Sequence, residues 1–130
     1  MDLKEIISKV SYSDEQMYSI MCCETQKGAF VVHVRGKLCS TLDDFFREIS
    51  AAMRFPYYFG WNWAAFDECM TDLEWLSFLD ILIVIDDFNL LFQNETPAKA
   101  YKDMLIKHLN IVAEYWISQS IPFLVYLNQK

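Results

Sequence analysis

The sequence predicts an α/β fold in which a small, three-stranded parallel sheet is packed with helices. Three short apolar runs, at 29–34, 81–85 and 122–127, are typical of buried strands. Segments with helical periodicity separate these runs, and parallel strands need such crossovers between them. The chain has 130 residues and is 54% apolar, which is enough for one domain with a hydrophobic core.

The first strand and the first helix of this sheet follow one another closely. The run AFVVHV at 29–34 is bounded by glycines and predicts a buried strand. We expect His33 to be a satisfied core or edge histidine, because no second His or Cys stands at ligand spacing. Apolar residues then recur at helical spacing over 42–53. Thr41 and Asp44 resemble the capping box that starts such a helix.

A second helix is predicted from about 63 to 72. Pro56 ends the first helix, and Asn62 is a good N-cap for the second. At helical spacing, the apolar and aromatic side chains fall on one side of this helix and should bury it. The other side should face solvent with Ala64, Asp67, Glu68, Thr71 and Asp72.

The remaining elements follow in order. The β-branched run ILIVI at 81–85 predicts a second buried strand. Thr96 is expected to be the N-cap of a long helix, with proline at its first position, that runs to about Ser118. His108 falls on the apolar stripe of that helix, so we interpret it as a core histidine. The run PFLVYL at 122–127 predicts the last strand.

We assign residues 28–130 to the main domain and residues 1–27 to an N-terminal extension. Within the extension, MDLKEIISKV is compatible with a short amphipathic helix and MYSIMCC with an extra edge strand. The charged N-terminus does not resemble a signal peptide, so we expect a non-secreted, cytoplasmic protein. No apolar run approaches the roughly 20 residues of a membrane span, so we expect no membrane association.

Catalytic and metal-binding patterns are weak. The four cysteines form no CxxC motif and there are only two histidines, so we expect reduced thiols and no zinc. Cys39 or Cys69 would need a histidine as base, but both histidines interrupt apolar runs. Asp86 and Asp87 follow a predicted strand and are compatible with Mg²⁺, which leaves a metal-dependent enzyme as a third hypothesis. We expect no enzyme, no cofactor and no metal.

Negative charge is concentrated in one segment. The net charge is −7, and residues 55–98 contain eight acids with no Lys or Arg. The flanking segments nearly balance, with 10 acids and 11 bases. This field disfavours nucleic acid as a direct ligand and favours a basic partner.

Bulky aromatic side chains accompany the acids. Tyr57, Tyr58, Phe59 and Trp61 form a turn just before the acidic helix. Aromatic residues beside charges are typical of protein interfaces with a few dominant contacts. We expect Phe59 and at least one of the tyrosines to be buried under the turn, and the others to contact a partner.

The stretch FPYYFGWNWAAFDECM followed by TDLEWL resembles the signature of the barstar family, whose members are intracellular inhibitors of barnase-type ribonucleases. The order of elements and the buried strand ending in an acid are also similar. The resemblance covers about residues 29–128. The matching features are Pro56, the aromatic pair Tyr58-Phe59, Gly60, Asn62, a bulky residue at 63, an acid at 68, Cys69 and an apolar residue at 70.

This resemblance implies a mechanism. In the family, an acidic helix and its preceding turn plug the active site of a basic nuclease, and carboxylates replace the RNA phosphates. By position, Tyr58 and Asn62 would lie at the rim of the interface. Glu68 takes the place of the dominant family Asp, and Asp86 lies near the place of a family Glu.

Several positions depart from the family pattern. Ala64 replaces an acid of the binding helix, Asp67 replaces a tryptophan, and Trp61 stands where barstar has an acid. Glu68 is one methylene longer than Asp. We therefore expect a cognate partner other than barnase, such as a nuclease toxin to which this protein confers immunity. The predicted partner-binding residues are Tyr58, Trp61, Asn62, Ala64, Asp67, Glu68, Asp72 and Asp86.

Two hypotheses for function stay open beside the metal-dependent enzyme. The first is an inhibitor of a basic ribonuclease or nuclease toxin, and the second is an acidic adaptor for a basic partner that is not a nuclease. Both need the same acidic helix. In either case we expect a monomer when the protein is free.

Overall fold

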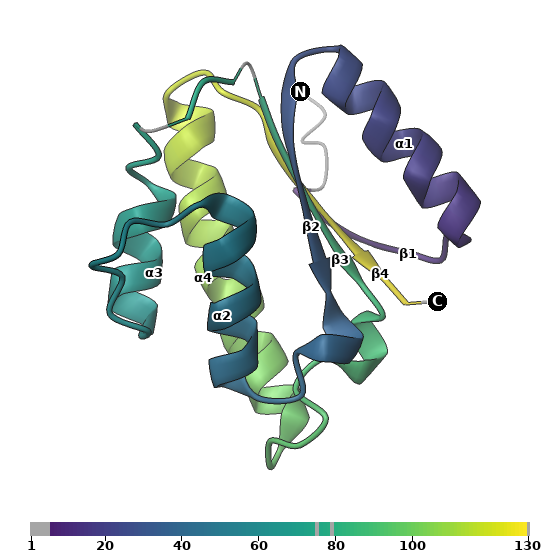
Figure 1. Ribbon diagram of the computed structural model, residues 1–130, viewed down its shortest axis with the longest axis vertical. Helices are drawn as coiled ribbons and strands as arrows, with labels where there is room; N and C mark the ends of the chain where they lie inside the picture. Colours follow the sequence, from purple (N-terminus) through teal and green to yellow (C-terminus); the bar gives the residue numbers. More distant parts are fainter. Residues whose placement is uncertain (1–5, 75, 79, 130) are drawn as a thin grey trace.

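The computed structural model describes residues 6–74, 76–78 and 80–129, and it contains a parallel four-stranded sheet between two layers of helices. Figure 1 shows α1 on one side of the sheet and α2, α3 and α4 on the other. The strands are β1 (Ile7–Val10), β2 (Ala29–Arg35), β3 (Asp80–Asp86) and β4 (Phe123–Asn128), in the order β1-β4-β3-β2.

Within the described residues, four α-helices and two short 3₁₀ turns connect these strands. Strands β2, β3 and β4 and the helix predicted at 42–53 lie where the sequence pattern placed them. No helix in the described part of the chain is long and apolar enough to cross a membrane. The helices are α1 (Asp14–Gln26), α2 (Leu42–Met53), α3 (Trp63–Met70) and α4 (Ala98–Ser118), and the 3₁₀ turns are η1 (Gly36–Leu38) and η2 (Phe88–Leu90).

The prediction of three strands is corrected to four, because β1 pairs with β4 along the edge of the sheet. The order within the N-terminal segment is also reversed: part of the predicted helix is strand β1, and the predicted strand lies inside α1. Residues 1–5 of that predicted helix lie outside the described part of the chain. A sequence signal for α1 was present, since Ser13 and Gln16 form a reciprocal capping box at its start.

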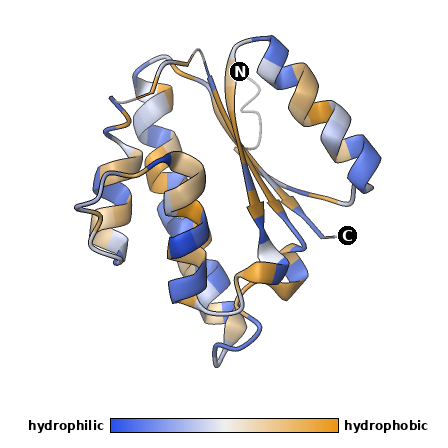
Figure 2. Ribbon diagram, in the orientation of Figure 1, coloured by the Kyte–Doolittle hydropathy of each residue, from blue (hydrophilic) through white to orange (hydrophobic). Residues whose placement is uncertain are grey.

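Strand β3 shows why the strands read as continuous apolar runs. Its alternate residues Ile81, Ile83 and Ile85 are buried in the core under α2, α3 and α4. The residues between them, Leu82 and Val84, are buried with α1 on the other face. Helices therefore cover both faces, which is the usual setting of a parallel sheet. Figure 2 shows the hydrophobic strands between the two helical layers.

Helix α4 starts one residue later than predicted. Thr96 is not the N-cap; that position is taken by Pro97, which follows a cis peptide bond and has an extended backbone. No side chain in the described part of the chain caps this end of the helix. Pro97 cannot donate a backbone hydrogen bond, which suits a position just before the first turn.

The start of α2 is tied to the segment before α4. Thr41 caps the helix as predicted, because its hydroxyl accepts a hydrogen bond from the Asp44 backbone N–H at 3.2 Å. A carboxylate oxygen of Glu95 accepts another from the Leu42 N–H at 2.9 Å. Glu95 therefore serves the fold, since a carboxylate at a helix N-terminus is stabilising.

Candidate functional site

The turn before α3 is held by one amide side chain. Asn62 is the N-cap, as predicted, and its Oδ1 accepts a hydrogen bond from the Ala65 N–H at 2.8 Å. Its Nδ2 donates to the Gly60 carbonyl at 3.0 Å. Both ends of the amide are therefore used within the protein, and they fix the direction in which the turn enters the helix.

The inner side of α3 is anchored on the core. Phe66 and Met70 are buried, and the indole of Trp63 lies edge-to-face on Phe46, with ring centroids 5.2 Å apart. Trp116 of α4 donates from Nε1 to the Met70 carbonyl at 2.7 Å. These contacts hold the helix firmly, so its outer side chains are presented on a rigid support.

Asp67 does not face solvent freely, which corrects the expectation that all acids of α3 do. His108 of α4 donates from Nδ1 to both carboxylate oxygens of Asp67, at 2.8 and 2.9 Å. The imidazole also stacks on the indole of Trp63, with centroids 4.6 Å apart and planes 4° from parallel. His108 is thus a partly buried link between two helices, because its polar ring needs a partner at that depth.

An acidic cluster forms on the outer side of α3 and just beyond its end. Glu68 and Asp72 are exposed there, and Glu74 is exposed on the following turn. Partial burial, and then the carboxylates of Asp72, Glu68 and Glu74, raise the pKa of Tyr58. The hydroxyl and the three acids therefore share one neighbourhood. We call Tyr58, Glu68, Asp72 and Glu74 the acidic face.

Glu74 is the member of the acidic face that the predicted site residues lack. The eight-acid segment included it, but it follows the helix and so fell outside the helical pattern used to select residues. The side chain of Glu68 makes no hydrogen bond or ion pair with the described residues. Ala64, also predicted, is exposed on the same outer side of α3.

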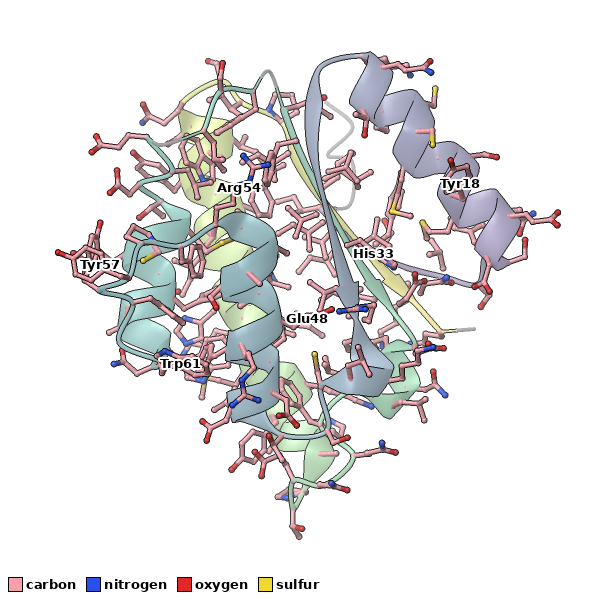
Figure 3. The ribbon with its side chains drawn as sticks, in the orientation of Figure 1. Tyr18, His33, Glu48, Arg54, Tyr57 and Trp61 are labelled. Carbon is pink, nitrogen blue, oxygen red and sulfur yellow. The ribbon has the colours of Figure 1, made fainter. Side chains whose placement is uncertain are left out.

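The aromatic turn is more exposed than predicted. Phe59 is buried, as expected, but Tyr57 is fully exposed and Tyr58 more than half exposed, so the expectation of a buried tyrosine is wrong. Trp61 is partly exposed, and the Arg47 guanidinium lies 5.7 Å from the centroid of its ring. Figure 3 shows Tyr57 and Trp61 on the outer side of the molecule, away from the sheet.

Asp86 is not brought together with the acidic face. It ends β3 on the face of the sheet that α1 covers, following the alternation of Leu82 and Val84. Its carboxylate accepts hydrogen bonds from His33 Nε2 at 2.5 Å and from Asn128 Nδ2 at 2.8 Å. His33 is therefore a satisfied histidine on an edge strand, which agrees with its interpretation from the sequence.

A small polar pocket of about 290 Å³ lies beside Asp86. Its lining combines three acidic and three basic side chains, so it lacks the one-signed field of the acidic face. Among the described residues, no group of three or more His, Cys, Asp or Glu is placed to hold a metal ion. The pocket is lined by Asp14, His33, Arg35, Lys37, Asp86 and Asp87.

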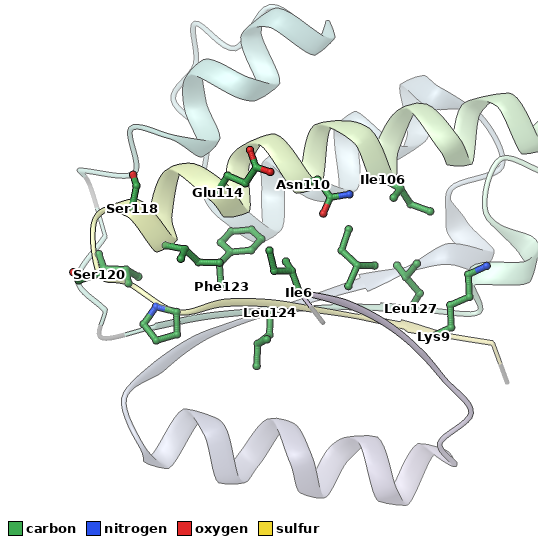
Figure 4. Close-up of a pocket in the computed structure, with 14 residues that line it drawn as sticks. Ile6, Lys9, Ile106, Asn110, Glu114, Ser118, Ser120, Phe123, Leu124 and Leu127 are labelled. Carbon is green, nitrogen blue, oxygen red and sulfur yellow. The ribbon is translucent and has the colours of Figure 1, made fainter. Parts of the chain in front are cut away.

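A larger apolar groove of about 1400 Å³ lies between β1, β4 and α4 (Figure 4). Its walls include Ile6, Ile106, Ile117 and Phe123, with Lys9 near one end. None of the residues of the acidic face lines it. The groove and the acidic face are therefore separate features of the surface.

Comparison with protein families gives a match over most of the chain. The model of the family described as Barstar (barnase inhibitor) matches residues 29–128. The matched range begins at the first residue of β2 and ends at the last residue of β4, so β1 and α1 lie outside it. No curated protein matches the chain significantly. From the family match, the chain belongs to the Barstar (barnase inhibitor) family, whose members are ribonuclease inhibitors and not enzymes.

Proposed function

We propose that this protein inhibits a basic ribonuclease or nuclease toxin by covering its active site with the acidic face. The observation that carries the proposal is the position of Glu68. Its side chain is exposed on the firmly anchored helix α3 and makes no internal pair with the described residues. Tyr58, which precedes the helix, and Asp72 and Glu74, which follow it, lie in the same neighbourhood. A partner with Arg and Lys in its cleft would pair with these charges.

The mechanism is substitution of carboxylates for RNA phosphates. A ribonuclease that binds RNA presents a positive cleft, because it must hold the phosphate backbone. The exposed acids of the acidic face carry charge of the same sign as that backbone, and Tyr57, Tyr58 and Trp61 supply aromatic contact area. The complex would therefore occlude the cleft without any chemical step.

Opposite charges should also accelerate the encounter. Association rates between a positive cleft and a negative surface rise at low salt and fall as salt screens the field. Barnase and barstar are themselves the standard example of this steering, so the expectation follows from family membership.

The partner we propose is not shaped for an aspartate at position 68. Glu68 reaches about one bond further than Asp would, Ala64 carries no charge, and the carboxylate of Asp67 is occupied by His108. The charge of the face is therefore displaced towards Asp72 and Glu74. A toxin nuclease to which this protein gives immunity, inside the cell that makes it, fits this arrangement, and the free inhibitor would be a monomer.

The test is inhibition of RNA cleavage by a panel of small basic ribonucleases that includes barnase and toxin-type enzymes. Each enzyme is titrated with the protein at low and at physiological salt. We expect one-to-one inhibition of at least one member, weaker at the higher salt. If no ribonuclease is inhibited at either salt concentration, the proposed function is wrong for these enzymes, and an acidic adaptor for a basic, non-nuclease partner becomes the better account.

A further inference from the structure

Helix α4 carries an exposed apolar stripe. Met104, Ile111 and Tyr115 are 40%, 44% and 40% exposed. Together with His108 they are spaced at i, i+4, i+7 and i+11, so they lie along one line of the helix. Large apolar residues gathered on a surface are more informative than scattered ones, because they mark interaction sites. We call Met104, Ile111 and Tyr115 the α4 stripe.

Three contacts place the α4 stripe alongside α3. His108, which lies between Met104 and Ile111 on the stripe line, stacks on Trp63 at the start of α3. The same histidine binds Asp67 at the middle of α3. Near the other end, Trp116, which follows Tyr115, donates to the last residue of α3. The stripe therefore borders α3 from its first turn to its last.

The inhibitory surface then has two halves of different chemistry. Glu68, Asp72 and Glu74 gather with Tyr58 in the acidic half. On the side towards α4, the carboxylate of Asp67 is held by His108. Beyond it lie the apolar side chains of the α4 stripe. A partner covering α3 from both sides would meet charge on one flank and hydrocarbon on the other.

We propose that the α4 stripe is part of the surface that binds the ribonuclease, and that the partner's basic cleft is bordered by an apolar patch. This inference rests on the proposed function, and it adds a property of the partner that the acids alone do not specify. The occupant is argued from the place of the stripe along α3, the helix whose outer side carries Glu68 of the acidic face. A large interface also needs an apolar component, since exposed ion pairs contribute little net affinity.

The two halves should act on different rate constants. Charges at the rim mainly set the association rate and its salt dependence. Buried apolar contacts mainly set the dissociation rate, because they are lost only when the complex separates. Variants in the α4 stripe should therefore raise the dissociation rate constant and leave the salt dependence of association unchanged.

The matched pair for this test is Ile111→Ser and Ile117→Ser. Ile117 lies on the same helix with almost the same exposure, 46%, but it lines the apolar groove on the side away from α3. Serine and isoleucine have similar helix propensities, so neither change should alter the helix much. Thermal unfolding of both variants checks that the fold is retained. Tyr115→Ala gives a second, independent variant in the stripe.

The binding partner in the test is the ribonuclease of the panel that the wild-type protein inhibits most strongly. Dissociation is followed by chasing the labelled complex with unlabelled inhibitor. We expect Ile111→Ser and Tyr115→Ala each to raise the dissociation rate about tenfold, as the loss of a well-buried interface side chain does. Ile117→Ser should change it less than about twofold.

The outcomes separate this inference from the proposed function. If Glu68→Gln weakens inhibition while both stripe variants dissociate like wild type, the acidic face binds and the α4 stripe does not. If Ile117→Ser has the same effect as Ile111→Ser, the effect is not specific to the stripe and the inference is wrong. If the wild-type protein inhibits no ribonuclease in the panel, both proposals are overturned together.

Discussion

Asp67→Ala should destabilise the fold, although its neighbour Glu68 can be changed at almost no cost. The wild-type carboxylate accepts a hydrogen bond from His108, whose side chain is only 14% exposed. Hydrogen bonds to charged groups contribute about 1.5–3 kcal/mol, and the partial access of water to this pair favours the lower end. Alanine improves helix propensity by about 0.5 kcal/mol. The net loss in the free energy of unfolding should be about 1 kcal/mol.

Two further variants make this prediction specific. Asp67→Asn keeps an acceptor oxygen for His108 without the charge, so it should cost about half as much. Glu68→Ala removes an exposed carboxylate with no internal partner among the described residues, so it should stay within about 0.5 kcal/mol of wild type. Positions 67 and 68 both lie on α3, so the three variants are compared in the same helix.

The assay is urea denaturation at pH 7, followed by tryptophan fluorescence, because Trp63 stacks directly on His108. A loss of 1 kcal/mol corresponds to a fall of roughly 4 °C in the melting temperature for a chain of this size, which gives a second readout. If Asp67→Ala is no less stable than Glu68→Ala, the link between α3 and α4 is not structural and our account of Asp67 is refuted.

Three other predictions concern the scaffold. Gly36→Ala should cost more than about 3 kcal/mol by urea denaturation, because the new Cβ would lie 2.4 Å from the backbone carbonyl oxygen that ends β3; a near-neutral effect would contradict this packing. The Arg35 guanidinium lowers the pKa of Glu48, so stabilisation by this pair is present above the ordinary glutamate pKa and is lost as pH falls through the lowered value. Glu48→Gln should therefore cost about 1 kcal/mol at pH 7, and its difference from wild type in urea midpoint should shrink below pH ~4. Burial raises the pKa of Cys39 to about 12, so a thiol reagent should modify the exposed Cys23 first and reach Cys39 only on unfolding; early labelling of Cys39 would mean that the site opens.

Local signals in the sequence were sufficient for most of the scaffold. Thr41 and Asn62 cap their helices as predicted, because a cap depends on residues within one turn. Strands β2, β3 and β4 were found because each is a dense apolar run. Strand β1 was missed because it has only four residues, which include Ser8 and Lys9. The capping box of α1 was a usable signal that the N-terminal prediction did not weigh.

The candidate site was harder to predict, because it depends on contacts between residues far apart in the chain. Asp67 and His108 are 41 positions apart, and no local pattern shows that one binds the other. Asp86 belonged to the same acidic segment as Glu68, yet the alternation along β3 turns its side chain to the α1 face. Counting that alternation from Ile85, which is buried on the other face, would have indicated the separation in advance.

The acidic segment as a whole shows the same limit. Its acids looked uniform in the sequence, but the fold uses several of them internally. Glu95 caps α2, Asp67 holds α4, and Asp86 binds His33 and Asn128. Charge counting therefore predicted a negative protein correctly but overstated how much of that charge a partner would meet.

The most direct test of the account compares two triple variants that remove the same number of charges. One neutralises the acidic face with Glu68→Gln, Asp72→Asn and Glu74→Gln. The other neutralises three exposed acids elsewhere and serves as the control: Glu15→Gln, Asp43→Asn and Glu114→Gln.

The measurement is the inhibition constant of each triple variant for the ribonuclease that the wild type inhibits. We expect the face variant to lose at least about a hundredfold in inhibition, because several charge pairs are lost at once, and the control to stay within about threefold. Equal losses in the two variants would show that only net charge matters, and would contradict the claim that the acidic face covers the active site.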